Sequence, residues 1–183
     1  MRRFGMSAVL AIGVVLAGCG GETKDENGGA AAKEVRAVAK LDGRDGAAVK
    51  GTATFVAKDG KVWLTVEIEG AAEGPHAFHI HEKGDCSAPD AKSAGGHWNP
   101  TGKAHGKWGE GEFHLGDIGN IVVGKDGKGS IKVETDLWTV GTGQPNDVVG
   151  KSVIVHEGAD DFKTQPTGNA GKRFGCGAIE LAK

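Results

Sequence analysis

The sequence lacks a cationic stripe, an amphipathic helix and a Cys-x-x-Cys pair, and each absence argues against a class of protein. Its 22 Lys and Arg residues are outnumbered by 24 Asp and Glu residues, which gives a formal net charge of −2. Nucleic-acid-binding proteins usually carry a basic stripe, so no nucleic-acid partner is expected. No segment has apolar residues at helical spacing, which disfavours a helical fold. The three cysteines are widely spaced, which weakens the case for a thiolate metal site.

Residues 1–18 are expected to be a signal peptide rather than part of the fold. Two arginines near the start precede an apolar run over 8–16 that is too short to span a bilayer comfortably. Small residues then lead to Cys19, an arrangement that resembles the lipobox of bacterial lipoproteins and predicts cleavage before a lipidated Cys19. The alternative is an ordinary signal peptide with an incidental cysteine. Residues 19–34 are polar and rich in Gly and Ala, which predicts a flexible tether before a domain over 35–183.

These features predict an exported protein that meets the membrane only through its lipid anchor, in the cell envelope or periplasm. Gly20 stands where retention in the inner membrane typically needs aspartate, so the outer membrane is favoured if the source is Gram-negative. An exported compartment is oxidising, so Cys86 and Cys176 are expected to form a disulfide. A thiolate ligand for copper or zinc is the weaker alternative.

From Val35 onward the sequence has the pattern of a β protein. Residues 35–41 and 62–68 alternate with period two, and Asp59-Gly60 marks a hairpin between strands at 51–56 and 62–68. Further strands are expected at 77–81, 121–123, 130–134, 151–155 and 177–181. Many short strands with regular turns favour a sandwich or barrel. Two long stretches, 82–119 and 157–175, interrupt the pattern, and loops of this length are usually functional or disordered.

Histidine is concentrated between residues 76 and 156, where all seven copies lie. Alternate residues of a strand share a face, so His79 and His81 point the same way and can converge on one ion. His76 has the parity of Phe78 and Ile80, which predicts a structural histidine on the packed side. The stretch 82–119 adds His97, His105, His114 and Asp117 at irregular spacings among glycines.

Two kinds of metal site follow from these residues. A mixed histidine and carboxylate set suits zinc. His156 ends an apolar strand and could return to the pair formed by His79 and His81, and an all-imidazole site suits copper. The alternative is a histidine-rich solvated loop, and the placement of histidines on strands argues against it.

Five segments resemble the signatures of the copper/zinc superoxide dismutase family. They span residues 74–85, 93–100, 114–120, 155–161 and 168–177, and the resemblance covers essentially everything from Val35 to the C-terminus. It implies an all-β fold, an eight-stranded Greek-key sandwich or flattened barrel with two long functional loops. It also implies an enzyme that converts superoxide to dioxygen and hydrogen peroxide with copper and zinc as cofactors, and it allows for a homodimer.

Position by position, the resemblance also implies a set of site residues. Copper would be bound by His79, His81, His97 and His156, and zinc by His97, His105, His114 and Asp117. His97 would join the two metals as an imidazolate and couple proton transfer to electron transfer. Asp160 would accept hydrogen bonds from His79 and His105 and fix their orientation. Arg173 would stand beside the open copper face and attract superoxide, which makes His97 and Arg173 the expected catalytic residues. Cys86 and Cys176 match the family's disulfide.

The substrate anion has to reach a domain whose mature chain is net negative. Loss of the two signal-peptide arginines moves the formal charge from −2 to −4, so Arg173 and nearby lysines must form a local positive funnel. Residues 161–167 resemble bacterial more than animal members, which leaves Lys163 and Lys172 only as candidates for this role.

Three alternative functions are compatible with a metal-binding or structural β-sandwich of this kind. A copper store or copper-delivery protein on the same fold would typically lack a copper ligand or the arginine, and this chain has all of them. A copper-only dismutase is disfavoured by the presence of His105, His114 and Asp117. A purely structural sandwich on the cell surface is the third alternative.

Overall fold

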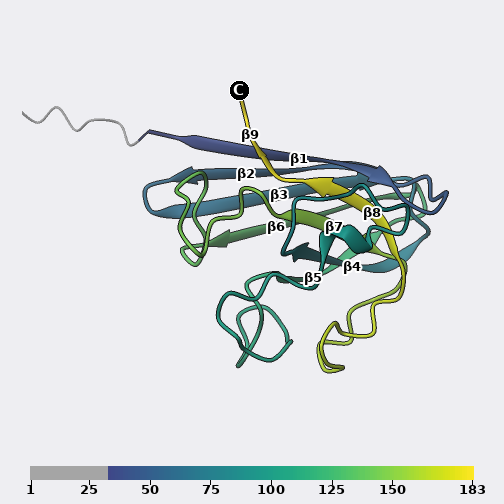
Figure 1. The fold of residues 1–183 in the computed structure, drawn as a ribbon. Helices are drawn as coiled ribbons and strands as arrows, with labels where there is room; N and C mark the ends of the chain where they lie inside the picture. The colour runs from purple at the N-terminus through teal and green to yellow at the C-terminus, as the bar shows by residue number, and fades with distance from the viewer. Residues whose placement is uncertain (1–32) are drawn as a thin grey trace, which may run out of the picture. The chain divides into compact units, whose positions relative to one another are not determined.

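The computed structural model describes residues 33–183, so the expected signal peptide, the lipidation of Cys19 and nearly all of the expected tether lie outside the described residues. The described residues form nine strands (Figure 1). These are β1 (Val35–Gly43), β2 (Lys50–Lys58), β3 (Lys61–Glu69), β4 (Gly74–His81), β5 (Asp117–Val123), β6 (Lys128–Thr135), β7 (Ser152–His156), β8 (Arg173–Ala178) and β9 (Glu180–Leu181). Within residues 33–183 the one helix is the short 3₁₀ turn η1 (Lys92–Ala94), and none is long enough to cross a membrane.

The strands close into an antiparallel barrel. Hydrogen bonds connect them in the order β2-β3-β6-β5-β4-β7-β8-β1, and β1 also pairs with β2, which closes the ring. β3 is joined to β6 and β4 to β7, so neighbours in space are not always neighbours in sequence, as in a Greek key. The expected eight-stranded fold is confirmed.

The last expected strand is divided into two pieces. Ile179 interrupts it because its backbone bonds to the segment before β7: Ile179 N–H donates to Lys151 O and Gly150 N–H donates to Ile179 O. After this break β9 pairs with β1, opposite Ala37 and Val38. The ninth strand is therefore the displaced end of the eighth.

Alternating side chains fill the barrel. In β3 the buried positions are Val62, Leu64, Val66 and Ile68, whereas the intervening residues face outward. Burial of each such side chain contributes about 1.5–3 kcal/mol. The hairpin between β2 and β3 turns at Asp59 and Gly60, both with positive φ (49° and 75°), the backbone that a tight two-residue hairpin turn requires.

Two long loops cover the outer side of β4 and β7, so both strands are buried on both faces. The ligand loop (residues 82–116) joins β4 to β5, and the closing loop (residues 157–172) joins β7 to β8. Figure 1 shows both loops leaving the barrel on the same side. A Cys86–Cys176 disulfide with a Cα–Cα distance of 5.8 Å ties the ligand loop to β8, which confirms the expected pairing.

Candidate metal centre

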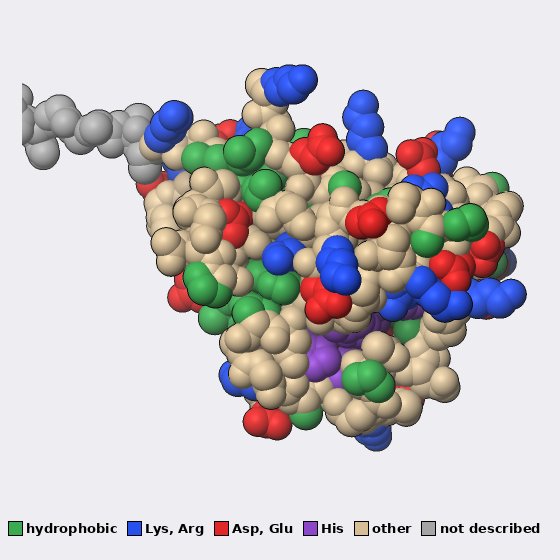
Figure 2. Space-filling model, viewed as in Figure 1, with side chains coloured by type: hydrophobic (Ala, Val, Ile, Leu, Met, Phe, Trp, Pro, Cys, Tyr) green, Lys and Arg blue, Asp and Glu red, His purple; other side chains and the backbone are tan. Residues whose placement is uncertain are grey.

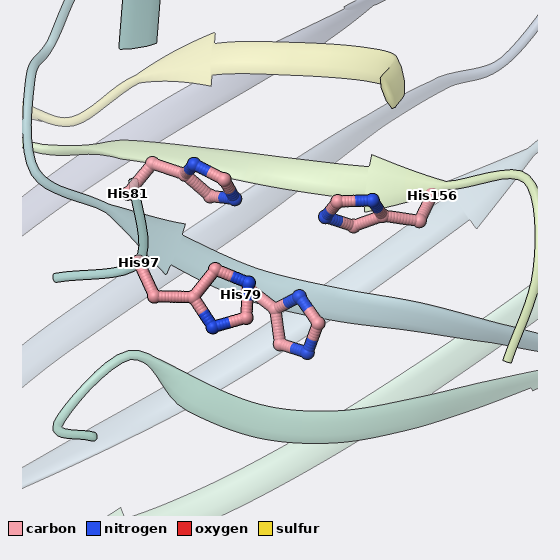
Figure 3. A group of neighbouring side chains, drawn as sticks. All are labelled: His79, His81, His97 and His156. Atoms are coloured by element: carbon pink, nitrogen blue, oxygen red, sulfur yellow. The ribbon is translucent and has the colours of Figure 1, made fainter. Parts of the chain in front are cut away.

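Four histidines form the first cluster, which we call the copper-side cluster. His79 and His81 lie on β4, His156 ends β7, and His97 comes from the ligand loop, where a β-bridge sets it opposite His81. All four residues are buried, with 0–7% of their surface exposed. One ring nitrogen from each lies within 4.8 Å of those of the others, and Figure 3 shows the rings gathered beside β4 and β7.

A second cluster, the zinc-side cluster, lies next to the first and shares His97 with it. Its members are His97, His105, His114 and Asp117, and their ligand atoms also lie within 4.8 Å of one another. The Asp117 carboxylate lies 2.8 Å from His97 Nδ1, 3.0 Å from His105 Nδ1 and 3.1 Å from His114 Nδ1. Asp117 reaches this position at the start of β5, where a register shift in β4 sets it opposite His79.

The buried nitrogens test whether these clusters fit metal ions. Six of them have no hydrogen-bond partner among the described residues: Nδ1 of His79, His105 and His114, and Nε2 of His81, His97 and His156. A buried polar atom left without a partner costs about 1–3 kcal/mol, so six together need a common explanation. Each belongs to one of the two clusters, and neutral imidazole nitrogen is a preferred ligand of copper and zinc. The residues therefore fit two metal ions.

Other contacts hold the opposite ring nitrogens of the ligand histidines. His81 Nδ1 lies 3.0 Å from Gly95 O, and His156 Nδ1 lies 3.4 Å from Gly171 O. Such partners fix the tautomer and the orientation of a metal-binding histidine. His76 differs, because its two ring nitrogens lie 3.0 Å from His156 O and 2.9 Å from Ala72 O. It has no free nitrogen to offer and fills the structural role expected for it.

One carboxylate spans the two clusters. Asp160 Oδ2 lies 2.8 Å from His79 Nε2, and Asp160 Oδ1 lies 3.0 Å from His105 Nε2, the two hydrogen bonds expected from the resemblance. Asn120 holds the backbone of Asp160 from both sides: its Nδ2 donates to Asp160 O, and its Oδ1 accepts from Asp160 N–H. The orientation of one ring in each cluster thus depends on a single side chain.

The electrostatics of the site favour neutral copper-side rings. Burial lowers the pKa of His97 to about 4, although its hydrogen bond to Asp117 acts in the opposite direction. Burial, the neighbouring histidines and the charge of Arg173 hold the pKa values of His81 and His156 well below the usual range. Neutral imidazoles have a free lone pair at neutral pH, which metal binding requires.

On the zinc side, the electrostatics favour charged groups instead. Burial acts to lower the pKa of His105, but the adjacent carboxylates of Asp117 and Asp160 outweigh it and raise that pKa to about 9. Burial acts to raise the pKa values of Asp117 and Asp160, yet hydrogen bonds from the histidines hold both well below the usual range. The zinc-side cluster therefore contains one ionised carboxylate, Asp117, and has a second, Asp160, beside it.

Arg173 begins β8 at the edge of the copper-side cluster. Its Nη1 donates to Ala91 O at 3.0 Å, and the side chain is half-buried. In Figure 2 histidine atoms reach the surface in a hollow beside Lys and Arg side chains. Lys163 and Lys172 lie exposed on the closing loop.

Two functional candidates were missed in the sequence. Asn120 lies inside a segment that resembles the family, and a polar side chain among the apolar residues that follow Asp117 in β5 was the signal that could have indicated it. Gln165 contacts the backbone of His105. No spacing or motif in the chain indicates that contact.

A closed β-barrel with two histidine-rich clusters that share one residue defines a class of binuclear metal-binding proteins. The family model described as copper/zinc superoxide dismutase (SODC) matches residues 49–179. This chain belongs to the copper/zinc superoxide dismutase family, which confirms the resemblance seen in its sequence.

Named relatives agree with this assignment. Superoxide dismutase [Cu-Zn] 2 of Aquifex aeolicus is 36% identical, covering 80% of this chain and 88% of that protein. Superoxide dismutase [Cu-Zn] 5 of Dictyostelium discoideum is 40% identical over 75% of this chain and 94% of its own. Superoxide dismutase [Cu-Zn] of Deinococcus radiodurans is 39% identical, covering 72% of this chain and 78% of that protein. A crystal structure of the clock protein EA4 superimposes with a TM-score of 0.71 at 36% identity, covering 80% of this chain and 94% of that one.

Proposed function

We propose that this chain dismutates superoxide to dioxygen and hydrogen peroxide, with copper in the cluster of His79, His81, His97 and His156 and zinc in the cluster of His97, His105, His114 and Asp117. The observation that carries the proposal is the membership of His97 in both clusters. Family membership and the named dismutase relatives support the same activity.

Dismutation needs both electron transfer, which a bound copper ion would supply, and proton transfer, which His97 can supply. Copper, when bound, supplies the one-electron redox chemistry, whereas zinc has no redox cycle and keeps a structural and electrostatic part. His97 directs Nδ1 to the Asp117 side and leaves Nε2 free on the copper side. From Nε2 it can hold a proton and pass it to the second superoxide as peroxide forms. Two superoxide anions and two protons thereby give one dioxygen and one hydrogen peroxide.

Arg173 supplies the attraction that an anionic substrate needs. Half-burial restricts its side chain, and the bond to Ala91 O fixes the guanidinium beside the copper-side cluster. A positive charge focused in a hollow raises the encounter rate of an anion by about ten- to a thousandfold. The fixed position of Arg173 supports a catalytic rather than a storage role.

We also propose that the protein works outside the cytoplasm, lipid-anchored at Cys19 in the cell envelope or periplasm, with protection of the envelope from superoxide as its role. The disulfide supports this location, because such bonds persist in oxidising compartments. Mass spectrometry of the membrane fraction would test the lipid on Cys19, and an unmodified soluble chain would contradict the anchor. A homodimer stays a prediction, which sedimentation of the purified chain tests.

One experiment tests the enzyme against the copper-binding alternative. The domain over 35–183 is purified, its copper and zinc contents are measured, and its consumption of superoxide is assayed. We expect one ion of each metal per chain and a rate close to the diffusion limit, about 10⁸–10⁹ M⁻¹s⁻¹. Two bound metals without activity would instead support a store or a delivery protein.

A further inference from the structure

Gln165 of the closing loop pairs with both backbone polar groups of His105 in the ligand loop. His105 N–H donates to Gln165 Oε1 at 2.9 Å, and Gln165 Nε2 donates to His105 O at 2.8 Å. His105 lies outside every strand, so it lacks the partners that a sheet would supply. A carboxamide has an acceptor and a donor side by side, and here it supplies the two hydrogen bonds that a neighbouring strand would otherwise make with His105.

The same loop also holds the ring of His105. Asp160 Oδ1 lies 3.0 Å from His105 Nε2. Gly168 lies over this contact with a φ of 67°, and a Cβ at that position would come within 2.7 Å of His105 Nε2. The closing loop therefore fixes His105 twice, by its backbone through Gln165 and by its ring through Asp160. The ring nitrogen left free is Nδ1, which faces Asp117 at 3.0 Å.

We propose that Gln165 is a positioning residue that keeps His105 Nδ1 aimed at the zinc-side cluster and so slows the release of zinc. The inference rests on the zinc role proposed for His105. With the Gln165 bonds absent, the His105 backbone is free to rotate, and Nδ1 moves away from the point where the other ligand atoms meet. The closing loop is also released from the ligand loop at this contact, which opens a path for the ion to leave.

The proposal predicts an effect on one metal rather than on both. His105 belongs to the zinc-side cluster alone, whereas the copper-side cluster consists of His79, His81, His97 and His156. If the Gln165 hydrogen bonds served only to stabilise the loops, their loss would change the release of both metals and the melting temperature of the metal-free chain. Partners that orient a metal ligand are typically worth about 10–100-fold in affinity. Because Gln165 acts through the backbone, we expect a value near the lower limit, about tenfold.

The test uses the full-length chain loaded with both metals. Gln165→Met preserves side-chain length while removing both hydrogen bonds to His105. The matched control is Gln144→Met, because Gln144 is the other glutamine of the chain and lies exposed. Zinc and copper transfer to a chelator is followed separately. We expect Gln165→Met to release zinc about tenfold faster, with copper release and the melting temperature of the metal-free chain unchanged, and the control to behave as wild type.

A second variant keeps the test decisive if Gln165→Met folds poorly. Gln165→Glu retains an acceptor for His105 N–H but has no donor for His105 O, and we expect its zinc release to be faster than that of the wild type. Equal acceleration for both metals, or unchanged zinc release in both variants, would overturn the inference. A zinc content that is the same in His105→Ala as in the wild type would instead show that His105 binds no zinc, and the proposed function would fail with it.

Discussion

Loss of the Cys86–Cys176 disulfide should destabilise the domain and also disturb the substrate-attracting arginine. The bond joins residues 90 apart in the sequence. Cys176 packs in a small core with Ala91, Ala94 and Ile154, and Cys86 lies against it. Ala91 O accepts the hydrogen bond from Arg173, so the disulfide fixes the segment that positions this side chain.

The size of the stability effect follows from the length of the closed loop. For a separation of 90 residues, the chain-entropy model gives about 4.6 kcal/mol at 25 °C. In a domain of about 150 residues, each kcal/mol shifts the melting temperature by about 2–4 °C. The double variant Cys86→Ala with Cys176→Ala should therefore melt about 10–18 °C lower than the wild type.

The assay is thermal unfolding of the metal-free chain, since bound metal would add its own stabilisation. Wild-type protein treated with a reductant is the control, because it loses the bond without any change of sequence. At low ionic strength, where attraction by Arg173 matters most, the metal-loaded double variant should consume superoxide more slowly than the wild type. A melting temperature within about 3 °C of the wild type would refute the chain-entropy argument for this bond.

Three further predictions concern the site. Arg173→Glu should lower the rate of superoxide consumption by at least tenfold and weaken its salt dependence, with both metals retained; an unchanged rate and salt dependence would refute the steering role. Asp160→Asn should weaken metal binding by about 10–100-fold, measured by chelator competition, and an unchanged affinity would exclude its orienting role. The metal-free chain should become more stable as pH rises from about 4 to 6.5. In this range His97 is protonated in the unfolded state but not in the folded state, where its pKa is about 4. Denaturant titrations at several pH values measure this stability, and the absence of such a rise would contradict the lowered pKa of His97.

The strands and the copper-side pair on β4 could be predicted because both depend on local periodicity. Each expected strand overlaps an observed one. In strands such as β3, period-two alternation reflects one buried and one exposed face, whereas β4 and β7 are short apolar runs buried on both faces. The same parity set His79 and His81 on one side and His76 on the other. The exception is the break at Ile179, which depends on backbone bonds to Gly150 and Lys151 that no local pattern encodes.

Contacts between the two long loops could not be predicted from the residues alone. The bridge that sets His97 opposite His81 joins an irregular segment to a strand, and only the resemblance to a family assigned His97 to both metals. Gln165 reaches His105 across 60 residues. Trp138 lies outside every strand, yet it is buried in the main core, and its Nε1 donates to Leu115 O.

Metal binding by His97→Ala tests directly whether His97 belongs to both metal sites. The variant is loaded with copper and zinc, and the visible spectrum of bound copper is recorded beside the affinity for zinc. A shared ligand predicts that the copper spectrum changes and that zinc affinity falls together with it, because one substitution removes a ligand from each cluster. A copper spectrum and a zinc affinity identical to those of the wild type would show that the two clusters are separate neighbours and that His97 is not shared.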